Sequence, residues 1–190
     1  MHTHSFADYV KRLDSNDWRG VAELMLSSAD RLARTGADFL ICPDNTLHIA
    51  LPAVRARSPL PWLHIVEVVA AEAKRRAYRR LGVTGTRYTM EGPVYPEVLG
   101  AAGLEHRVPG PESRERIDRI IFDELVNGRF TAESLAFFQT AIAALGQEGC
   151  DAVVLGCTEI PLLVPPEASP LPTLDSTRLL ARAAVERALA

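Results

Sequence analysis

The sequence lacks the short motifs that mark the commonest nucleotide and metal sites. It contains no G-x-G-x-x-G segment and no G-K-[ST] loop, so the binding of a dinucleotide or a nucleoside triphosphate has no support in the sequence. It also contains neither a C-x-x-C pair nor an H-E-x-x-H motif, which argues against a structural or protease-type zinc site. We therefore expect no metal in the functional site.

Long apolar runs, cysteines and excess charge are scarce as well. No apolar run approaches the roughly 20 residues that a membrane-spanning helix needs, and Met1–Ser5 lack the basic and apolar regions of a secretory signal. The three cysteines are an odd set without tight spacing, which fits a reducing cytoplasm. A net charge of -3 argues against a nucleic-acid surface. We expect a cytoplasmic protein that binds neither a membrane nor a nucleic acid.

Short apolar segments alternate with helical segments along the 190 residues, which can bury a sizeable core. Asp17, Thr131 and Asp175 are typical of helix starts. Alternating strands and helices predict an α/β fold with a mostly parallel sheet. The expected strands are residues 38–41, 62–65, 81–84, 105–108, 152–155 and 171–174.

One of these strands leads into a cluster of reactive side chains. Ala152–Leu155 is an apolar run typical of a strand buried on both faces. Gly156 ends it, and a thiol, a hydroxyl and a carboxylate follow at Cys157, Thr158 and Glu159. Ligands of an α/β sheet bind at the carboxyl ends of its strands. Cys157 is therefore a candidate nucleophile or base, although free cysteine is also among the most buried residue types.

The same pattern occurs earlier in the chain. Residues 36–41 (GADFLI) match residues 149–154 (GCDAVV) at a constant separation of 113, and residues 60–64 resemble residues 171–175 at a separation of 111. The repeat predicts two pseudo-symmetric lobes with one cleft between them, although any two α/β units can share such an entry to a strand. The approximate lobes are residues 1–85 with 171–190, and residues 86–170. The same separation pairs Asp44 with Cys157, Asn45 with Thr158 and Thr46 with Glu159.

A further polar loop, Gly85–Met90, follows the expected strand at 81–84. Thr86 and Thr89 place two hydroxyls three residues apart at a strand-to-helix junction. Hydroxyls and backbone amides at a helix start can bind an anion. The same spacing also fits plain helix capping, and the sequence does not separate the two interpretations.

A cysteine abstracts a proton from carbon only as a thiolate, and its ordinary pKa is about 8.5. The segment after Cys157 is expected to be helical, and a helix start lowers such a pKa. Asn45, Thr46, Thr86, Thr89 and other neutral donors suit a substrate carboxylate. Two such clusters facing one carbon could remove a proton on one side and return it on the other, which is racemisation without a cofactor.

Three segments together resemble the aspartate/glutamate racemase superfamily. They are Leu-Gly-Cys-Thr-Glu-Ile-Pro-Leu-Leu-Val around Cys157, Asn-Thr-Leu-His from Asn45, and Gly-Thr-Arg-Tyr-Thr-Met from Gly85. The resemblance covers essentially the whole chain. It implies two α/β lobes around a cleft, no pyridoxal phosphate, an amino-acid or dicarboxylate substrate and usually a homodimer.

The resemblance also implies roles for single residues. Cys157 is the acid/base thiol, and Glu159 matches the acidic position of the motif. The substrate carboxylate lies among Asn45, Thr46, Thr86 and Thr158.

Two features depart from the family pattern. Cys42 stands two residues further from the Asn-Thr pair than the family's first cysteine, so the partner position falls on Asp44 as a possible second base. We expect Cys42 to be buried at the strand end rather than in the cleft. The usual opening strand, glycine-rich loop and helix do not precede Met1–Phe6. We expect either an upstream segment or another chain to cover the exposed sheet edge.

The sequence therefore predicts a cofactor-independent amino-acid racemase of the aspartate/glutamate type. The alternatives are a one-thiol decarboxylase or isomerase of a dicarboxylate, and an inactive relative that only binds carboxylates. The sequence does not identify the side chain of the substrate, because Arg55, Arg57 or Arg87 could each bind a distal carboxylate.

Overall fold

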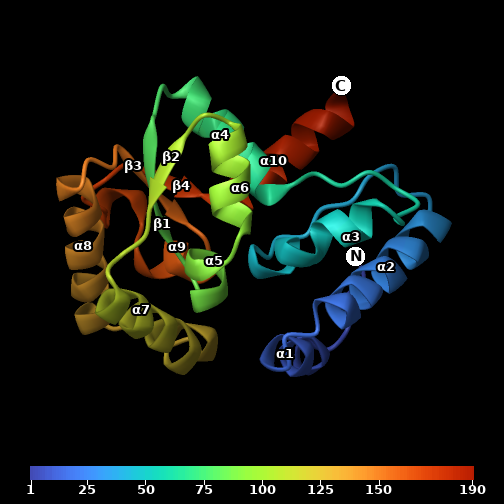
Figure 1. Ribbon diagram of the computed structural model, residues 1–190, viewed down its shortest axis with the longest axis horizontal. Coiled ribbons are helices and arrows are strands. Elements are labelled where there is room, and N and C mark those ends of the chain that lie inside the picture. The colour runs from blue at the N-terminus through green and yellow to red at the C-terminus, as the bar shows by residue number, and fades with distance from the viewer.

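The computed structural model describes all residues, 1–190, and contains one sheet of four parallel strands in the order β2-β1-β3-β4 (Figure 1). The predicted α/β class with a parallel sheet is confirmed. The strands are β1 (Arg80–Thr84), β2 (Glu105–Arg107), β3 (Ala152–Leu155) and β4 (Thr173–Asp175).

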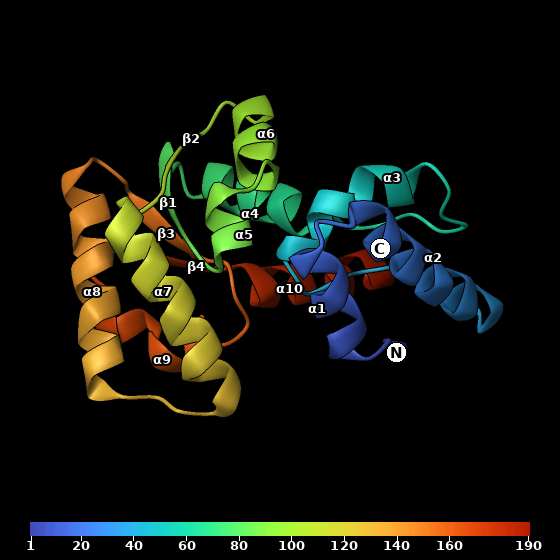
Figure 2. The same ribbon diagram turned by 60° about the horizontal axis from the view of Figure 1, so that its bottom comes forward.

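Helices cover both faces of this sheet (Figures 1 and 2). One face carries α4 (Ile65–Arg75), α6 (Val94–Ala101) and α10 (Ser176–Leu189). The other carries α7 (Pro111–Asp123), α8 (Ala132–Gln147) and α9 (Ile160–Leu163). Along β3, Val154 packs on the first face while Val153 and Leu155 pack on the second. This central strand is therefore buried on both faces, as its continuous apolar run predicted.

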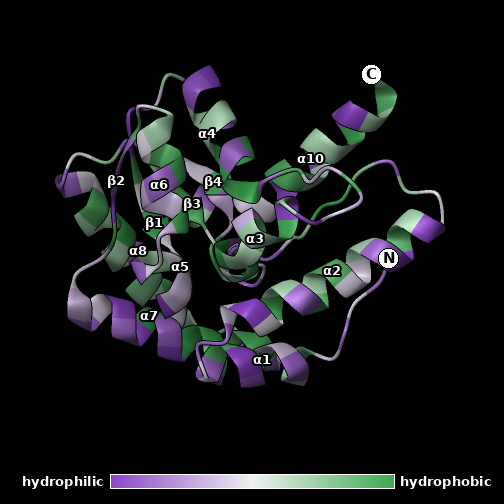
Figure 3. Cartoon of the chain, turned by 45° about the vertical axis from the view of Figure 1, so that its right-hand side comes forward, coloured by the Kyte–Doolittle hydropathy of each residue, from purple (hydrophilic) through white to green (hydrophobic).

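The first part of the chain forms a separate apolar cluster. It contains α1 (Phe6–Asp14), α2 (Trp18–Arg34), the 3-10 helix η1 (Thr46–Ala50) and α3 (Leu51–Arg55). Hydrophilic and hydrophobic residues alternate along α2 (Figure 3), and its buried side includes Val21 and Met25. The remaining short helices are α5 (Arg87–Glu91), η2 (Leu125–Asn127) and η3 (Pro166–Ala168). None of the helices combines the length and apolar character that crossing a bilayer requires.

The strands predicted at 38–41 and 62–65 are reduced to a single parallel pairing of Leu40 with Trp62. That prediction is wrong in extent. Pro43 and Pro61 lie at the ends of the paired stretch, and proline has no N–H to extend the ladder.

The internal repeat nevertheless has a structural counterpart. The N–H of Leu40 donates to the carbonyl of Pro61 at 2.9 Å, and the N–H of Val153 donates to the carbonyl of Pro172 at 2.9 Å. Leu40 and Val153 are related by the separation of 113, and the two prolines by that of 111. The two halves therefore pair their equivalent segments through the same hydrogen bond.

The helices before these segments also correspond. Asp17 caps α2 and Thr131 caps α8, each by accepting a hydrogen bond from the backbone N–H three residues on. Gly36 follows α2 and Gly149 follows α8, both with φ of 84°. Because a side chain strains that conformation, glycine permits the same turn into each strand segment.

The predicted lobe boundaries put β1 and β4 in one lobe and β2 and β3 in the other. All four strands pair within one sheet, so the sheet crosses both boundaries. The division into lobes stays a prediction.

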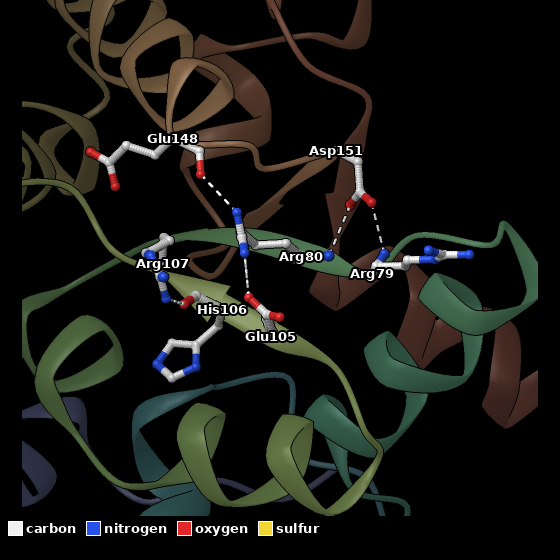
Figure 4. Close-up of polar contacts among 7 residues, drawn as sticks. All are labelled: Arg79, Arg80, Glu105, His106, Arg107, Glu148 and Asp151. Carbon is white, nitrogen blue, oxygen red and sulfur yellow. Dashed lines mark hydrogen bonds and ion pairs between the residues drawn. The ribbon is translucent and has the colours of Figure 1, made fainter.

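Polar contacts join the amino ends of the strands (Figure 4). The guanidinium of Arg80 donates to the Glu105 carboxylate at 2.6 Å and to the carbonyl of Glu148 at 3.0 Å. The carboxylate of Asp151 accepts from the backbone N–H groups of Arg79 and Arg80 at 2.7 and 3.3 Å. These contacts lie at the amino ends of the strands, whereas the clustered thiol, hydroxyls and carboxylates follow the carboxyl ends.

Candidate active site

The segments that follow Leu40, β1 and β3 meet at one cavity of about 410 Å³. Most of the predicted site residues line it, whereas Thr89 and Cys42 do not. The predicted residues that line the cavity are Asp44, Asn45, Thr46, Thr86, Cys157, Thr158 and Glu159.

Two glycines allow the loops after β1 and β3 to approach closely. The N–H of Gly156 donates to the carbonyl of Thr84 at 2.8 Å, and a Cβ at Gly156 would lie 2.7 Å from that oxygen. A Cβ at Gly85 would lie 2.9 Å from the Thr89 side chain. Any larger residue would push the two loops apart. The glycines thus hold the segment carrying Cys157 beside the loop carrying the threonines.

The thiol of Cys157 donates to the Glu159 carboxylate at 2.9 Å. Burial raises the pKa of Cys157 well above its ordinary value, and the hydrogen bond and negative charge of Glu159 raise it further. The expected lowering by a helix start is wrong. The helix α9 that follows has only four residues, whereas a carboxylate lies directly against the sulfur. The site therefore holds a protonated thiol at neutral pH.

Asp44 is the counterpart of this thiol. Burial raises the pKa of the Asp44 carboxyl, partly offset by hydrogen bonds from the backbone N–H groups of Leu47 and Thr46. The Leu47 bond measures 2.9 Å. A carboxylate with a raised pKa is a stronger base than an exposed aspartate.

Asp44 and Cys157, which the separation of 113 pairs in the sequence, both line the cavity. The Asp44 carboxylate accepts from the backbone N–H of Thr46, and the Cys157 sulfur accepts from that of Glu159, each two residues on. The charge of Asp44 contributes to the raised pKa of Cys157.

The side-chain amide of Asn45 is engaged by two buried residues rather than being free to bind a substrate carboxylate with both of its hydrogens. Its Oδ1 accepts from the Tyr95 hydroxyl at 2.8 Å, and its Nδ2 donates to Ser176 Oγ at 3.0 Å. One amide hydrogen remains for a ligand. Sequence reasoning missed Tyr95 and Ser176, since one stands in an apolar helix face and the other directly after a helix cap.

The threonine hydroxyls form a short chain. Thr46 and Thr86 lie 3.3 Å apart through their Oγ1 atoms, and Thr86 and Thr89 lie 3.3 Å apart in the same way. Thr89 is buried behind Thr86 and does not line the cavity. The chain joins the loop after Leu40 to the loop after β1, and its hydroxyls can turn toward an anion.

Cys42 packs against the apolar cluster of α1, α2 and α3. Burial raises the pKa of its thiol to about 12. A thiol in this environment is a poor base.

The three arginines considered for a distal carboxylate differ in placement. Arg55 pairs with Glu67 at 2.9 Å and Arg57 with Glu23 at 2.5 Å, and neither lines the cavity. Arg87 does line it, with its guanidinium over the Tyr88 ring at 5.3 Å from the centroid.

Part of the cavity wall was not foreseen from the sequence. α1 and α7 contribute apolar side chains, among them Phe6, Val10, Ile121 and Phe122. Their helical spacing indicates a buried face but not what it faces. Asp118 of α7 accepts from the backbone N–H of Arg87 at 2.7 Å, which ties this wall to the threonine loop.

His48 holds the Asp44 segment from behind. The carbonyl of Asp44 can only accept, so His48 Nδ1 donates to it at 2.7 Å, and His48 Nε2 accepts from the N–H of Ile65 at 3.2 Å. This pattern selects the neutral ring. The ring is 1% exposed and packs edge-on against His64. His48 is therefore a buried packing residue rather than a surface one.

This histidine makes stability depend on pH. Burial lowers the pKa of His48 to about 3, so the unfolded chain binds the proton first as the pH falls below about 6.5. We expect the free energy of unfolding to fall between pH 7 and pH 5, with about 2 kcal/mol of the loss due to His48. Urea unfolding of wild type and His48→Asn at both pH values measures this share. An equal loss in the variant would contradict it.

Glu159 raises the pKa of the Cys157 thiol beyond the effect of burial. Glu159→Gln removes the charge and the strongest acceptor beside Cys157, so we expect the Cys157 pKa to fall and alkylation at pH 8 to accelerate by roughly tenfold per pKa unit. Mass spectrometry of iodoacetamide-treated protein measures the rate at this residue. The exposed Glu167→Gln is the control. An unchanged rate in Glu159→Gln would show that burial alone governs the thiol.

The residues of the cavity offer no metal-binding cluster, since no group of three or more His, Cys, Asp or Glu side chains is suitably placed. The cavity is lined by one thiol, by several hydroxyls and by the carboxylates of Asp14, Asp44, Asp118 and Glu159. The fold and cavity define an α/β protein whose strand ends open into one cavity with polar loops on one side and an apolar wall on the other.

Comparison with known proteins specifies this class. Residues 1–184 match the family model described as Asp/Glu/Hydantoin racemase. The chain is similar to the broad specificity amino-acid racemase RacX of Bacillus subtilis (strain 168), with 26% identity over 166 residues that cover 87% of this chain and 71% of RacX. It is 29% identical to a glutamate racemase of Roseiflexus sp. (strain RS-1) over 142 residues, 70% of this chain and 48% of that protein. The chain thus spans about half the length of the curated glutamate racemases that it matches.

Solved structures of racemase-family proteins are also similar to this chain. An aspartate racemase homologue from Pyrococcus horikoshii OT3 matches with a TM-score of 0.87 and 28% identity, covering 100% of this chain and 82% of that one. A candidate Asp/Glu racemase from Yersinia pestis matches with a TM-score of 0.91 and 32% identity, covering 98% and 82%. The chain belongs to the Asp/Glu/hydantoin racemase family. The resemblance seen around Cys157, Asn45 and Gly85 is confirmed.

Proposed function

We propose that this protein is a cofactor-independent amino-acid racemase in which Asp44 and Cys157 move the α-proton on opposite faces of the substrate. One observation carries the proposal. Asp44 and Cys157, which the separation of 113 pairs in the sequence, line one cavity, and the negative charge of Asp44 contributes to the raised pKa of Cys157. The family relationship, and the similarity to a racemase of broad specificity, support the same reaction class.

The protonation states suit a two-base exchange. In one direction the Asp44 carboxylate removes the α-proton while the Cys157 thiol delivers its proton to the opposite face. The protein is left with a protonated Asp44 and a thiolate, which is the form that converts the other enantiomer. A substrate ammonium among Asp44, Cys157 and Glu159 offsets the negative charges that raise the thiol pKa, and so eases formation of the thiolate.

The hydroxyls and the side wall bind the rest of the substrate. Thr46, Thr86 and Thr158 offer neutral donors to the α-carboxylate, whose negative charge grows as the α-carbon loses its proton. Arg87 is the cation placed to meet a distal carboxylate, beside the apolar wall of α1 and α7. The substrate side chain therefore extends toward α5 and α7.

The pairing of the Asp44 carboxylate with the Cys157 thiol also supports a different class of reaction. Because a carboxylate rather than a second thiol faces Cys157, one-sided chemistry is also supported, namely decarboxylation or isomerisation of a dicarboxylate by a single thiol. An inactive relative would keep the hydroxyls and bind carboxylates without turnover.

Proton NMR in deuterium oxide with a panel of L- and D-amino acids separates these functions. Racemisation predicts loss of the α-proton signal together with inversion. Exchange without inversion supports the one-sided enzyme. A rise in melting temperature with dicarboxylates and no exchange after long incubation supports the binding protein, and the racemase proposal then fails.

The homodimer implied by the family belongs to the same proposal. Light scattering of the purified chain with and without substrate measures it. A monomer that racemises would remove the dimer from the proposal.

A further inference from the structure

A buried chain of hydrogen bonds connects the two loops that carry Asp44 and Cys157. The Tyr95 hydroxyl donates to Asn45 Oδ1 at 2.8 Å, and Asn45 Nδ2 donates to Ser176 Oγ at 3.0 Å. The Ser176 hydroxyl then donates to the carbonyl of Leu155 at 3.0 Å. Asn45 adjoins Asp44, and Leu155 stands two residues before Cys157. The chain therefore spans the site from one loop to the other.

The direction of every bond in this chain is determined. The carbonyl of Leu155 only accepts, so the Ser176 hydroxyl must donate to it and accept from Asn45. The amide of Asn45 then turns its oxygen toward Tyr95, whose hydroxyl must donate. Any one replacement leaves a buried polar atom without its partner, which is costly.

The three side chains of this hydrogen-bond chain are shielded from water. Asn45 is 5% exposed, Tyr95 1% and Ser176 0%. Burial also raises the pKa of Tyr95, so its hydroxyl stays a donor at every working pH. The three side chains come from the loop after Leu40, α6 and α10, so the chain anchors both site loops to helices on one face of the sheet.

We propose that Tyr95 and Ser176 are positioning residues that hold Asp44 and Cys157 at the separation which two-sided proton transfer requires. Neither side chain lines the cavity, so neither touches the substrate. The kinetic part of this inference rests on the proposed racemisation. A shift of about 1 Å between reacting groups can cost a hundredfold in rate. Inversion requires Asp44 and Cys157 to be correctly positioned at the same time, whereas exchange on one face requires only one of them.

The test compares Tyr95→Phe, Ser176→Ala and their double variant with a matched control. Thr84→Val is the control, because the Thr84 hydroxyl also donates to a β3 carbonyl, that of Val154 at 2.8 Å, without reaching Asn45. Proton NMR in deuterium oxide gives the inversion rate and the rate of exchange with retention. Hydrogen-exchange mass spectrometry of residues 44–48 and 155–159 reports the loops without requiring activity.

Both single variants should lower inversion by about tenfold or more while exchange with retention falls by less than about threefold. The double variant should lose no more than the worse single one, because both bonds belong to one chain. Both site segments should exchange their amide hydrogens faster than in Thr84→Val. Equal loss of the two rates, or unchanged amide exchange, overturns the inference. A wild type without turnover overturns the proposed function instead, and amide exchange alone then decides whether the chain holds the loops.

Discussion

Replacing Cys157 with alanine is expected to lower α-proton exchange from the enantiomer that Cys157 deprotonates by about 10³-fold or more, because general acid–base groups contribute about 10²–10⁴-fold to such steps. The thiol lines the cavity and holds its proton against Glu159. Proton NMR in deuterium oxide measures the exchange in wild type and in Cys157→Ala.

The other two cysteines provide the controls. Cys150 is buried behind the sheet and Cys42 packs on the cluster of α1, α2 and α3, and neither lines the cavity. Cys150→Ala and Cys42→Ala should keep exchange rates within about threefold of wild type when folded protein is compared. Exchange from that enantiomer that survives in Cys157→Ala would remove this thiol from the mechanism. Loss of exchange in Cys42→Ala would assign the role to Cys42 instead.

The second large effect is expected for Asp44→Asn. Asparagine keeps an oxygen for the backbone N–H of Leu47 but cannot take a proton. We expect inversion to fall by about a hundredfold. Exchange with retention survives through the thiolate form of Cys157, whose pKa falls once the negative charge of Asp44 is removed. Following both enantiomers by NMR or chiral chromatography in deuterium oxide measures the two rates.

A matched control for Asp44→Asn lies at the other end of the sheet. The Asp151 carboxylate also accepts from a backbone N–H, that of Arg79 at 2.7 Å. Asp151→Asn should leave both rates unchanged. Inversion within about threefold of wild type in Asp44→Asn would show that a different group acts on the second face.

Most of the fold was predictable because it depends on local and periodic patterns. The apolar run Ala152–Leu155 marked the central strand, and Asp17 and Thr131 marked helix starts that the structure confirms. Periodicity reports burial on a face, which each segment carries in its own residues. The predicted strand at 38–41 was too long. A strand also needs a neighbouring segment with free backbone N–H groups, and the residues of the strand itself do not show which segment will be its neighbour.

The site was predictable as far as the internal repeat reaches. The separation of 113 paired Asp44 with Cys157, and both residues line one cavity. The behaviour of the thiol was not predictable. A pKa depends on burial and on the charges that folding brings near, and here Glu159 and desolvation outweigh a helix start of four residues.

The sequence alone determined the α/β class, the helix caps and the family, because each of these is expressed in residues close together in the chain or in a repeated pattern. Only the tertiary structure decided that Tyr95 and Ser176 hold Asn45, that α1 and α7 wall the cavity and that Cys157 keeps its proton. These facts depend on contacts between residues up to 131 positions apart. Such contacts exist only once the chain has packed.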